Sequence, residues 1–192
     1  MGHIVPPYFM ATHKPVEVDE LFGDLEPASG DQKWFVVRTK PRREKKLAEY
    51  AGKRKINYYL PLQDSEKIYN RRRIVFTKPL FSGYIFVKCD NNERRQLLIT
   101  GHTAHFINVI NDRELTDELK NIFLGLKKGA LMRSSEFLTK GIKVRITAGS
   151  FEGLTGFVKD QKNINEVILQ VNLLRQAVSV VVNPENVKII KE

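Results

Sequence analysis

The chain has 192 residues, of which 28% are charged and 42% hydrophobic, and it carries a formal net charge of +10. This length suits one ordinary domain or two small ones. No apolar run approaches the roughly 18 residues of a membrane-spanning helix, and the first thirty residues lack the basic start and apolar core of a secretory signal. The single cysteine, Cys89, excludes a disulfide framework and multi-cysteine zinc sites, so we expect a reducing, cytoplasmic location.

The positive charge is concentrated in one part of the chain. Residues 1–30 sum to −4, residues 31–80 to +10 and residues 81–192 to +4. Such a concentration favours contact with a polyanion, because lysine and arginine neutralise phosphates and release counterions. The alternative is a basic surface that only keeps the protein soluble. The distribution favours the first interpretation and predicts nucleic-acid contact through residues 31–80.

Residues 1–32 contain four prolines, an acidic centre and no sustained hydrophobic period. They predict a mobile acidic tail, with at most one helical turn around Val18–Leu25. The β-rich run Trp34–Val37 predicts a buried strand. Arg42–Lys55 follows it and predicts a helix with a single narrow apolar stripe.

The next segments alternate between strand and helix patterns. In chain order we expect a strand at Ile56–Leu60, a hairpin over residues 63–78 that turns at Asn70, a strand at Leu80–Lys88, a short helix after Asp90, and a strand at Ala104–Ile110.

A longer helix has the clearest signals in this half of the chain. Thr116 is the predicted N-cap, apolar residues follow at helical spacing, and Gly129 ends the helix. Residues 33–129 therefore predict an α+β sandwich, in which helices pack against an antiparallel sheet.

Beyond residue 129 the pattern changes. Residues 130–140 have no clear period and predict a linker, whereas residues 141–192 contain five short strand patterns and no helical one. A small closed five-stranded β-barrel accounts for such a series and leaves no exposed sheet edge. The expected strands are Ile142–Ile146, Phe157–Val158, Val167–Val171, Val178–Val182 and Val187–Ile190.

Residues suited to catalysis are scarce. His102 and His105 have helical rather than strand spacing for a shared metal, and no carboxylate cluster accompanies them. Cys89 directly follows a strand and is expected to be a buried, inert thiol. No glycine-rich loop precedes a helix as a phosphate-binding loop would. The sequence predicts no enzyme activity, no cofactor and no metal site.

Two segments carry a family resemblance. Residues 141–156, GIKVRITAGSFEGLTG, resemble a KOW motif. Trp34–Val37, Leu60–Pro61 and Phe81–Val87 resemble the N-terminal domain of the NusG family of transcription elongation factors, and that domain followed by a KOW barrel is the family's architecture. Ser82 departs from the pattern, which usually has proline there. The RRR hairpin and Pro79–Phe81 are most similar to the specialised RfaH and UpxY-type antiterminators, with housekeeping NusG as the alternative within the family.

The resemblance implies a non-enzymatic factor that binds RNA polymerase and suppresses pausing or termination. It implies docking on the polymerase clamp helices through Phe81 and Tyr84, with Phe106 as a third candidate, although each could instead be sheet core. It also implies that Phe151 in the KOW domain contacts a ribosomal protein or Rho, or else plugs the barrel. A KOW-containing ribosomal or RNA-binding protein is the alternative from another class. The residues implied in contact with upstream duplex or non-template DNA are Arg38, Lys40, Arg42, Arg43, Arg71, Arg72 and Arg73.

Overall fold

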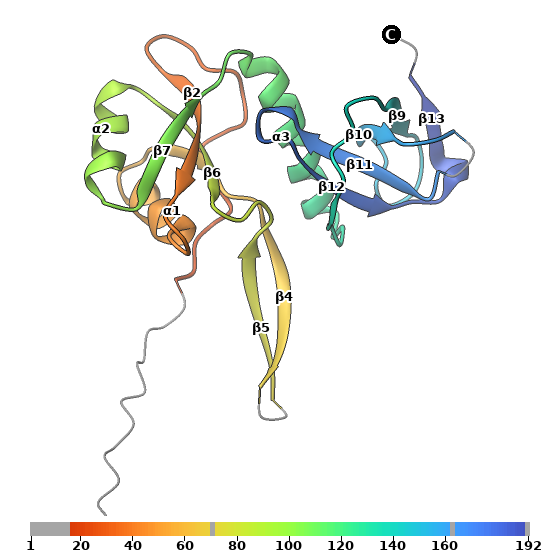
Figure 1. Ribbon diagram of the computed structural model, residues 1–192, viewed down its shortest axis with the longest axis horizontal. Helices are drawn as coiled ribbons and strands as arrows, with labels where there is room; N and C mark the ends of the chain where they lie inside the picture. Colours follow the sequence, from red (N-terminus) through yellow and green to blue (C-terminus); the bar gives the residue numbers. More distant parts are fainter. Residues whose placement is uncertain (1–15, 70–71, 162–163, 191–192) are drawn as a thin grey trace, which may run out of the picture.

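The structure, a computed structural model, describes residues 16–69, 72–161 and 164–190. Two antiparallel sheets lie on either side of helix α3 (Asp112–Lys127), and a long hairpin projects from the region between them (Figure 1). None of the helices within these residues is long and apolar enough to cross a membrane.

The first sheet has five strands in the order β1-β3-β6-β2-β7, and its pairs are antiparallel. Helices α1 and α2 cover one face and α3 covers the other, which confirms the predicted α+β arrangement of this half. The bounds are β1 (Leu21–Phe22), β2 (Lys33–Thr39), α1 (Glu44–Lys53), β3 (Asn57–Tyr59), β6 (Tyr84–Cys89), α2 (Asn91–Ile99) and β7 (Thr103–Asn108).

Alternation along the central strands explains this layering, since successive side chains of a strand point to opposite faces. On β2, Phe35 and Val37 pack against α1 and α2, while Trp34 and Val36 pack against α3. A strand with both faces covered has no polar side to expose, which is why its sequence is a continuous apolar run.

Helix α3 begins earlier than the sequence suggests, and the N-cap predicted at Thr116 is wrong. The side chain of Asn111 caps the helix by accepting a hydrogen bond from the Glu114 amide at 3.2 Å. Thr116 is buried inside the helix, where its hydroxyl donates to the Arg113 carbonyl at 3.1 Å. Asn111 followed three residues later by Glu114 is itself a capping pattern, and it adds a turn before the apolar stripe begins.

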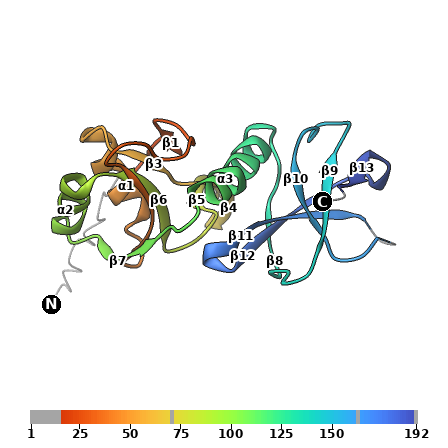
Figure 2. The same ribbon diagram turned by 90° about the horizontal axis from the view of Figure 1, so that it is seen from above.

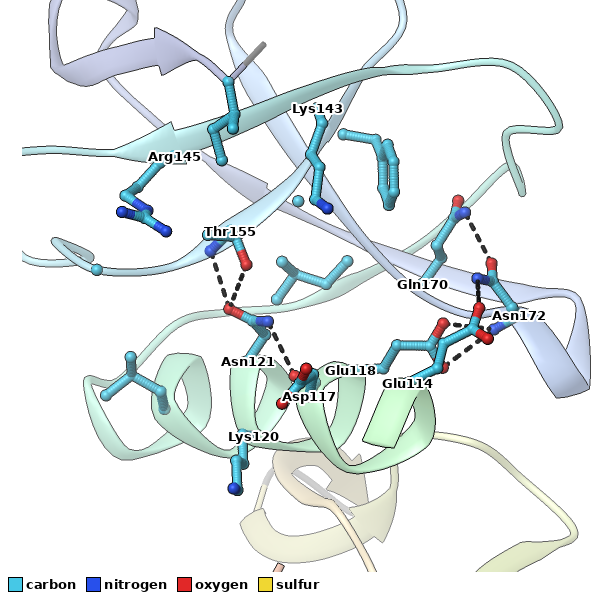
Figure 3. Close-up of a pocket in the computed structure, with 16 residues that line it drawn as sticks. Glu114, Asp117, Glu118, Lys120, Asn121, Lys143, Arg145, Thr155, Gln170 and Asn172 are labelled. Carbon is cyan, nitrogen blue, oxygen red and sulfur yellow. Dashed lines mark hydrogen bonds between the residues drawn. The ribbon is translucent and has the colours of Figure 1, made fainter. Parts of the chain in front are cut away.

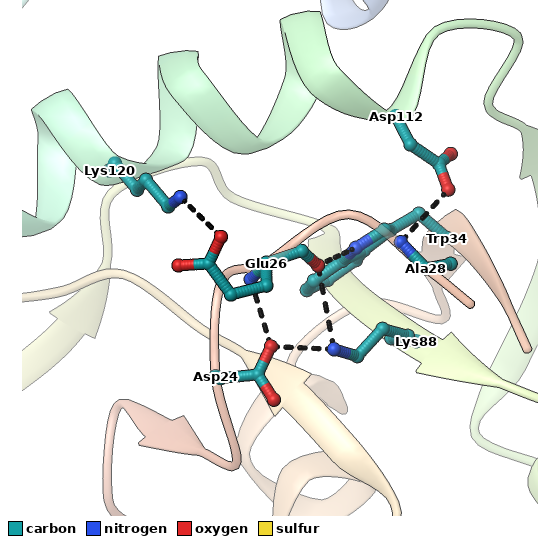
Figure 4. Close-up of polar contacts among 7 residues, drawn as sticks. All are labelled: Asp24, Glu26, Ala28, Trp34, Lys88, Asp112 and Lys120. Carbon is teal, nitrogen blue, oxygen red and sulfur yellow. Dashed lines mark hydrogen bonds and ion pairs between the residues drawn. The ribbon is translucent and has the colours of Figure 1, made fainter.

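Residues 16–32 are not a tail, and no helical turn forms at Val18–Leu25. Strand β1 pairs with β3, and Leu25 is buried. Figure 4 shows the polar contacts that hold the segment: the Trp34 indole donates to the Glu26 carbonyl, and Lys88 pairs with Asp24 at 2.6 Å. Lys88 is 64 residues from Asp24 in the sequence, so local propensity gives no sign of this pairing. Residues 1–15 of the predicted tail lie outside the described residues.

The hairpin consists of β4 (Leu62–Tyr69) and β5 (Arg72–Pro79) and forms a two-stranded sheet of its own. It confirms the predicted hairpin and is longer at its base. Figure 1 shows it extending away from both larger sheets. The turn predicted at Asn70 lies outside the described residues.

The second sheet has six antiparallel strands in the order β13-β9-β10-β11-β12-β8 (Figure 2). The five predicted strands are present, but the predicted linker contributes a sixth, β8, which pairs with β12. Among the described residues no ladder joins β13 to β8, so hydrogen bonds do not close this sheet into the predicted barrel. The bounds are β8 (Arg133–Ser135), β9 (Ile142–Ile146), β10 (Thr155–Val158), β11 (Glu166–Val171), β12 (Gln176–Val181) and β13 (Val187–Ile189).

Helix α3 packs on both sheets, and one apolar cluster runs from Trp34 through Leu119 to Val144. Gly125 allows the close approach on the second side, because a Cβ there would lie 2.5 Å from the Met132 methyl carbon. The second sheet is therefore joined to the first by a shared core as well as by the chain.

Candidate functional site

A basic corner forms where β2 ends and α1 begins. Its members, Arg38, Lys40, Arg42 and Arg43, are all exposed. The Lys40 amide donates to the His102 carbonyl at 2.8 Å, which fixes the turn against the start of β7. Burial lowers the pKa of His102, and the nearby Arg43, Lys46 and Lys40 lower it further. Four of the predicted nucleic-acid residues are thus exposed at this corner, with Lys40 and Arg43 near His102 and Arg38 beside Tyr84.

The loop before β6 is fastened to this corner through Gly83. Its amide donates to the buried Glu44 carboxylate at 2.7 Å, and its carbonyl accepts from the Thr39 amide at 2.9 Å. Gly83 has φ of +86°, a conformation that glycine adopts without strain. This bend allows Phe81 and Tyr84 to pack against the same core cluster although they are three residues apart.

The three predicted docking aromatics do not share one surface. Phe81 is only 2% exposed and packs edge-on against Phe86, so in this conformation it belongs to the core. Tyr84 is partly buried, and the Arg38 guanidinium lies 5.9 Å from its ring centre. Phe106 packs on the opposite face of the sheet, edge-on to Phe35, with the Arg94 guanidinium 5.0 Å from its ring centre. A single flat partner cannot contact Tyr84 and Phe106 together.

The hairpin is anchored to the same region, because the Lys45 ammonium donates to the Thr77 hydroxyl at 2.7 Å. Of the predicted arginine triplet, Arg71 lies outside the described residues and Arg72 is described only by its backbone. Arg73 forms an ion pair with Glu66 across the hairpin. Its charge is therefore partly neutralised, which sequence alone could not reveal.

In the second sheet, Phe151 lies in the turn between β9 and β10. The turn is shaped by Gly149 and Gly153, which have φ of +83° and +93°. Phe151 is half-buried and packs against the core cluster, so its ring is neither fully exposed nor fully enclosed.

A groove that the sequence does not predict runs between α3 and the second sheet, with a cavity volume of about 790 Å³ (Figure 3). The Asn121 side-chain oxygen accepts from the Thr155 amide at 2.8 Å, and Glu118 accepts from the Asn172 amide at 3.2 Å. Burial raises the pKa of Glu118 to about 8. In the sequence these polar residues are typical of a solvent-exposed helix face. Their contacts with the second sheet can be seen only in the structure.

The described residues contain no group of three or more histidine, cysteine or acidic side chains placed to hold a metal. Cys89 is buried, as predicted, and burial raises its thiol pKa to about 12. A thiol with so high a pKa is protonated at neutral pH and therefore a poor nucleophile.

Comparison with protein families gives a match over most of the first sheet, the hairpin and part of α3. Residues 32–122 match the NusG family, described as transcription termination factor nusG. The matched region runs from the start of β2 into α3. It includes the basic corner, the loop of Phe81 and Tyr84, and the whole hairpin.

Proposed function

We propose that this chain, which belongs to the NusG family through the domain matched over residues 32–122, is a transcription elongation or antitermination factor. The family match is the observation that carries the proposal, since proteins of this family generally bind RNA polymerase. Its action is non-enzymatic and cytoplasmic: the domain docks on polymerase and suppresses pausing or termination.

The surface around Tyr84 is the proposed polymerase contact. Its ring is partly exposed and lies beside the basic corner, with Arg38 over it. Aromatic residues that pair a broad apolar surface with a polar edge are common anchors of interfaces. Phe106, on the other face, is the competing candidate, and Phe81 supports the loop from beneath.

The basic corner and the hairpin are the proposed DNA contacts. Both are exposed; the basic corner is fastened to the Tyr84 loop through Glu44, and the hairpin is fastened to α1 through Lys45. A factor bound to polymerase at Tyr84 would therefore present its cations in a fixed geometry to upstream duplex or non-template DNA. Phosphate contacts of this kind position a protein without reading sequence.

The second sheet is proposed to be a KOW domain that recruits a further partner through the Phe151 turn, with a ribosomal protein or Rho as the candidates. The strand alternation and the glycines at positive φ support this assignment. The half-buried ring of Phe151 leaves part of its surface for a partner.

The test is binding of the purified protein to RNA polymerase, compared among Tyr84→Ala, Phe106→Ala and Phe22→Ala. Phe22 is 37% exposed on the edge strand β1 and serves as the control aromatic. Loss of a central aromatic anchor typically costs about 2–4 kcal/mol, so we expect Tyr84→Ala to bind roughly thirty- to a thousand-fold more weakly. Thermal unfolding of each variant separates lost docking from lost folding.

The outcomes divide the alternatives. Normal binding by Tyr84→Ala together with weak binding by a stably folded Phe106→Ala would move the contact to the opposite face. Co-purification with ribosomes and not with polymerase would overturn the proposal and favour a KOW-containing ribosomal or RNA-binding protein.

A further inference from the structure

The hairpin separates its charges between its two faces. Directly paired residues of antiparallel strands point to the same side. One face carries the pairs Asp64–Thr77, Glu66–Val75 and Ile68–Arg73. It therefore holds both acidic residues of the hairpin, with Arg73 bound to Glu66.

The opposite face carries the pairs Gln63–Lys78, Ser65–Phe76 and Lys67–Ile74, and we call it the basic face. Its two lysines are exposed and its described residues include no acid. Ile74 and Phe76 are 49% and 39% exposed, which is unusual for large apolar side chains. The basic face thus combines cations with uncovered apolar surface, as a nucleic-acid platform does.

At the base of the hairpin, the basic face continues into a groove between the two sheets, which has a cavity volume of about 430 Å³. The Gln63 side chain accepts from the Met132 amide at 2.9 Å, which places this face against the start of the second sheet. Lys78 lines the groove from the hairpin, Ser134 and Ser135 line it from β8, and Arg175 lines it from the turn before β12. No acidic residue lies among the groove's lining residues.

Two features fix Arg175 at the edge of the groove: its backbone conformation and the contact of its guanidinium with an aromatic ring. It has φ of +51°, which non-glycine residues rarely adopt, and its guanidinium lies 5.3 Å from the Phe137 ring centre. Strained backbone of this kind is concentrated at functional sites. Among the described residues neither Arg175 nor Lys78 forms an ion pair, so both cations are available to a ligand.

We propose that the basic face and this groove form one continuous track for single-stranded DNA, shared between the two halves of the chain. Lys67, Lys78 and Arg175 bind phosphates along one strand, with at least one nucleotide between the phosphates of the two lysines. Lys67 and Lys78 lie four residue pairs apart along the hairpin, which is about 13 Å at the usual strand rise, and Phe76 lies between them. Because a base exposes its π-face only when it is unpaired, Phe76 favours a single strand over a duplex. This proposal rests on the proposed function, which brings DNA to the hairpin. It specifies that the DNA is single-stranded and adds the second sheet to the binding site.

The experiment measures fluorescence anisotropy of a labelled mixed-sequence single strand of about 16 nucleotides with the full chain. On single strands each phosphate contact contributes about 0.7 to the slope of log affinity against log salt, so Lys78→Ala/Arg175→Ala should lower the slope by about 1.4. The control Arg95→Ala/Lys188→Ala removes the same charge from exposed positions on α2 and β13, away from the track. We expect it to leave the slope unchanged.

A second pair of variants tests the platform. Phe76→Ala removes a stacking surface, and we expect about tenfold weaker binding. Val75→Ala, on the opposite face and 58% exposed, should bind as the parent does. Equal loss in both variants, or an unchanged salt slope in Lys78→Ala/Arg175→Ala, would overturn the track.

Competition with duplex DNA and with single-stranded RNA of the same sequence completes the test. Tighter binding of either competitor would overturn the assignment to single-stranded DNA. If substitutions in the basic corner weaken DNA binding while those in the track do not, the track fails and the proposed function stands. If the protein binds no DNA but still binds polymerase, the track and the proposed DNA contacts both fail.

Discussion

At the scale of single residues, Gly156 shows how tightly the second sheet is built. A Cβ at this position would lie 2.6 Å from the Ile168 carbonyl oxygen on the neighbouring strand, and also 2.6 Å from a Val167 methyl carbon. The carbonyl belongs to the backbone and cannot move aside without distorting β11. The glycine is therefore required by close packing, although its own backbone is ordinary strand.

We expect Gly156→Ala to lower the free energy of unfolding by about 1–3 kcal/mol, the usual cost of overpacking a closed interior. Urea denaturation measures the change. Gly52→Ala is the matched control, because a Cβ there meets only ordinary contacts at 3.6 Å or more from Tyr58, and alanine favours the helix interior by up to about 1 kcal/mol. A stable Gly156→Ala would show that the two strands can move apart.

Some features of single residues could be predicted from the sequence, and others could not. The Ser82-Gly83 bend and the four cations of the basic corner follow from turn chemistry and charge. The pairing of Arg73 with Glu66 and the burial of Phe81 do not. They depend on cross-strand register and on α3, which no local pattern specifies.

At the scale of elements, α3 has two interfaces where its sequence shows one. The apolar residues at helical spacing after Thr116, which include Leu119 and Ile122, predicted the contact with the first sheet. The second contact uses Glu118 and Asn121, which are typical of a solvated face. Strands β1 and β8 were also missed, because two or three residues carry no detectable alternation and are held by their partners.

The α3 groove should make stability depend on pH. The pKa of Glu118 rises from 4.5 to about 8 in the folded state, mainly through burial. Between these values the folded protein keeps a proton that the unfolded chain releases, so the free energy of unfolding falls as pH rises and levels off above about pH 8. We expect a loss on the order of 1 kcal/mol between about pH 5 and pH 8.5, reduced by water in the open groove.

Thermal unfolding across this pH range measures the effect. Glu118→Gln retains an oxygen that accepts from Asn172 and cannot ionise, so its stability should lose this component of the pH dependence. Asp117→Asn, an exposed neighbour on the same helix, should keep it. If the parent and Glu118→Gln respond equally to pH, Glu118 is not buried against the second sheet in solution.

At the scale of the whole molecule, the shared core predicts that both halves unfold together. The only tryptophan, Trp34, lies in the first half and packs into the cluster that continues through α3 into the second sheet. We expect Trp34 fluorescence and the hydrogen exchange of β11 to report one unfolding transition in urea.

The variant Asn121→Ala tests the coupling of the two halves directly, because it leaves the Thr155 amide without its hydrogen-bond acceptor on α3. The loss should be about 1–3 kcal/mol and should appear with both probes. A shift seen by β11 alone, or two separate transitions in the parent, would show that the halves are independent domains as the sequence pattern implied.

The position of β8 has a consequence for the reach of the second half. The segment 130–140 could extend at most about 38 Å if it were free, yet three of its residues are paired with Ala177–Ser179 and cannot act as a free tether. The groove is therefore kept at a high effective concentration beside the hairpin. In the proposed track, a DNA strand that first binds the hairpin would reach Arg175 without a second search through solution, so binding to the two halves would be a single encounter.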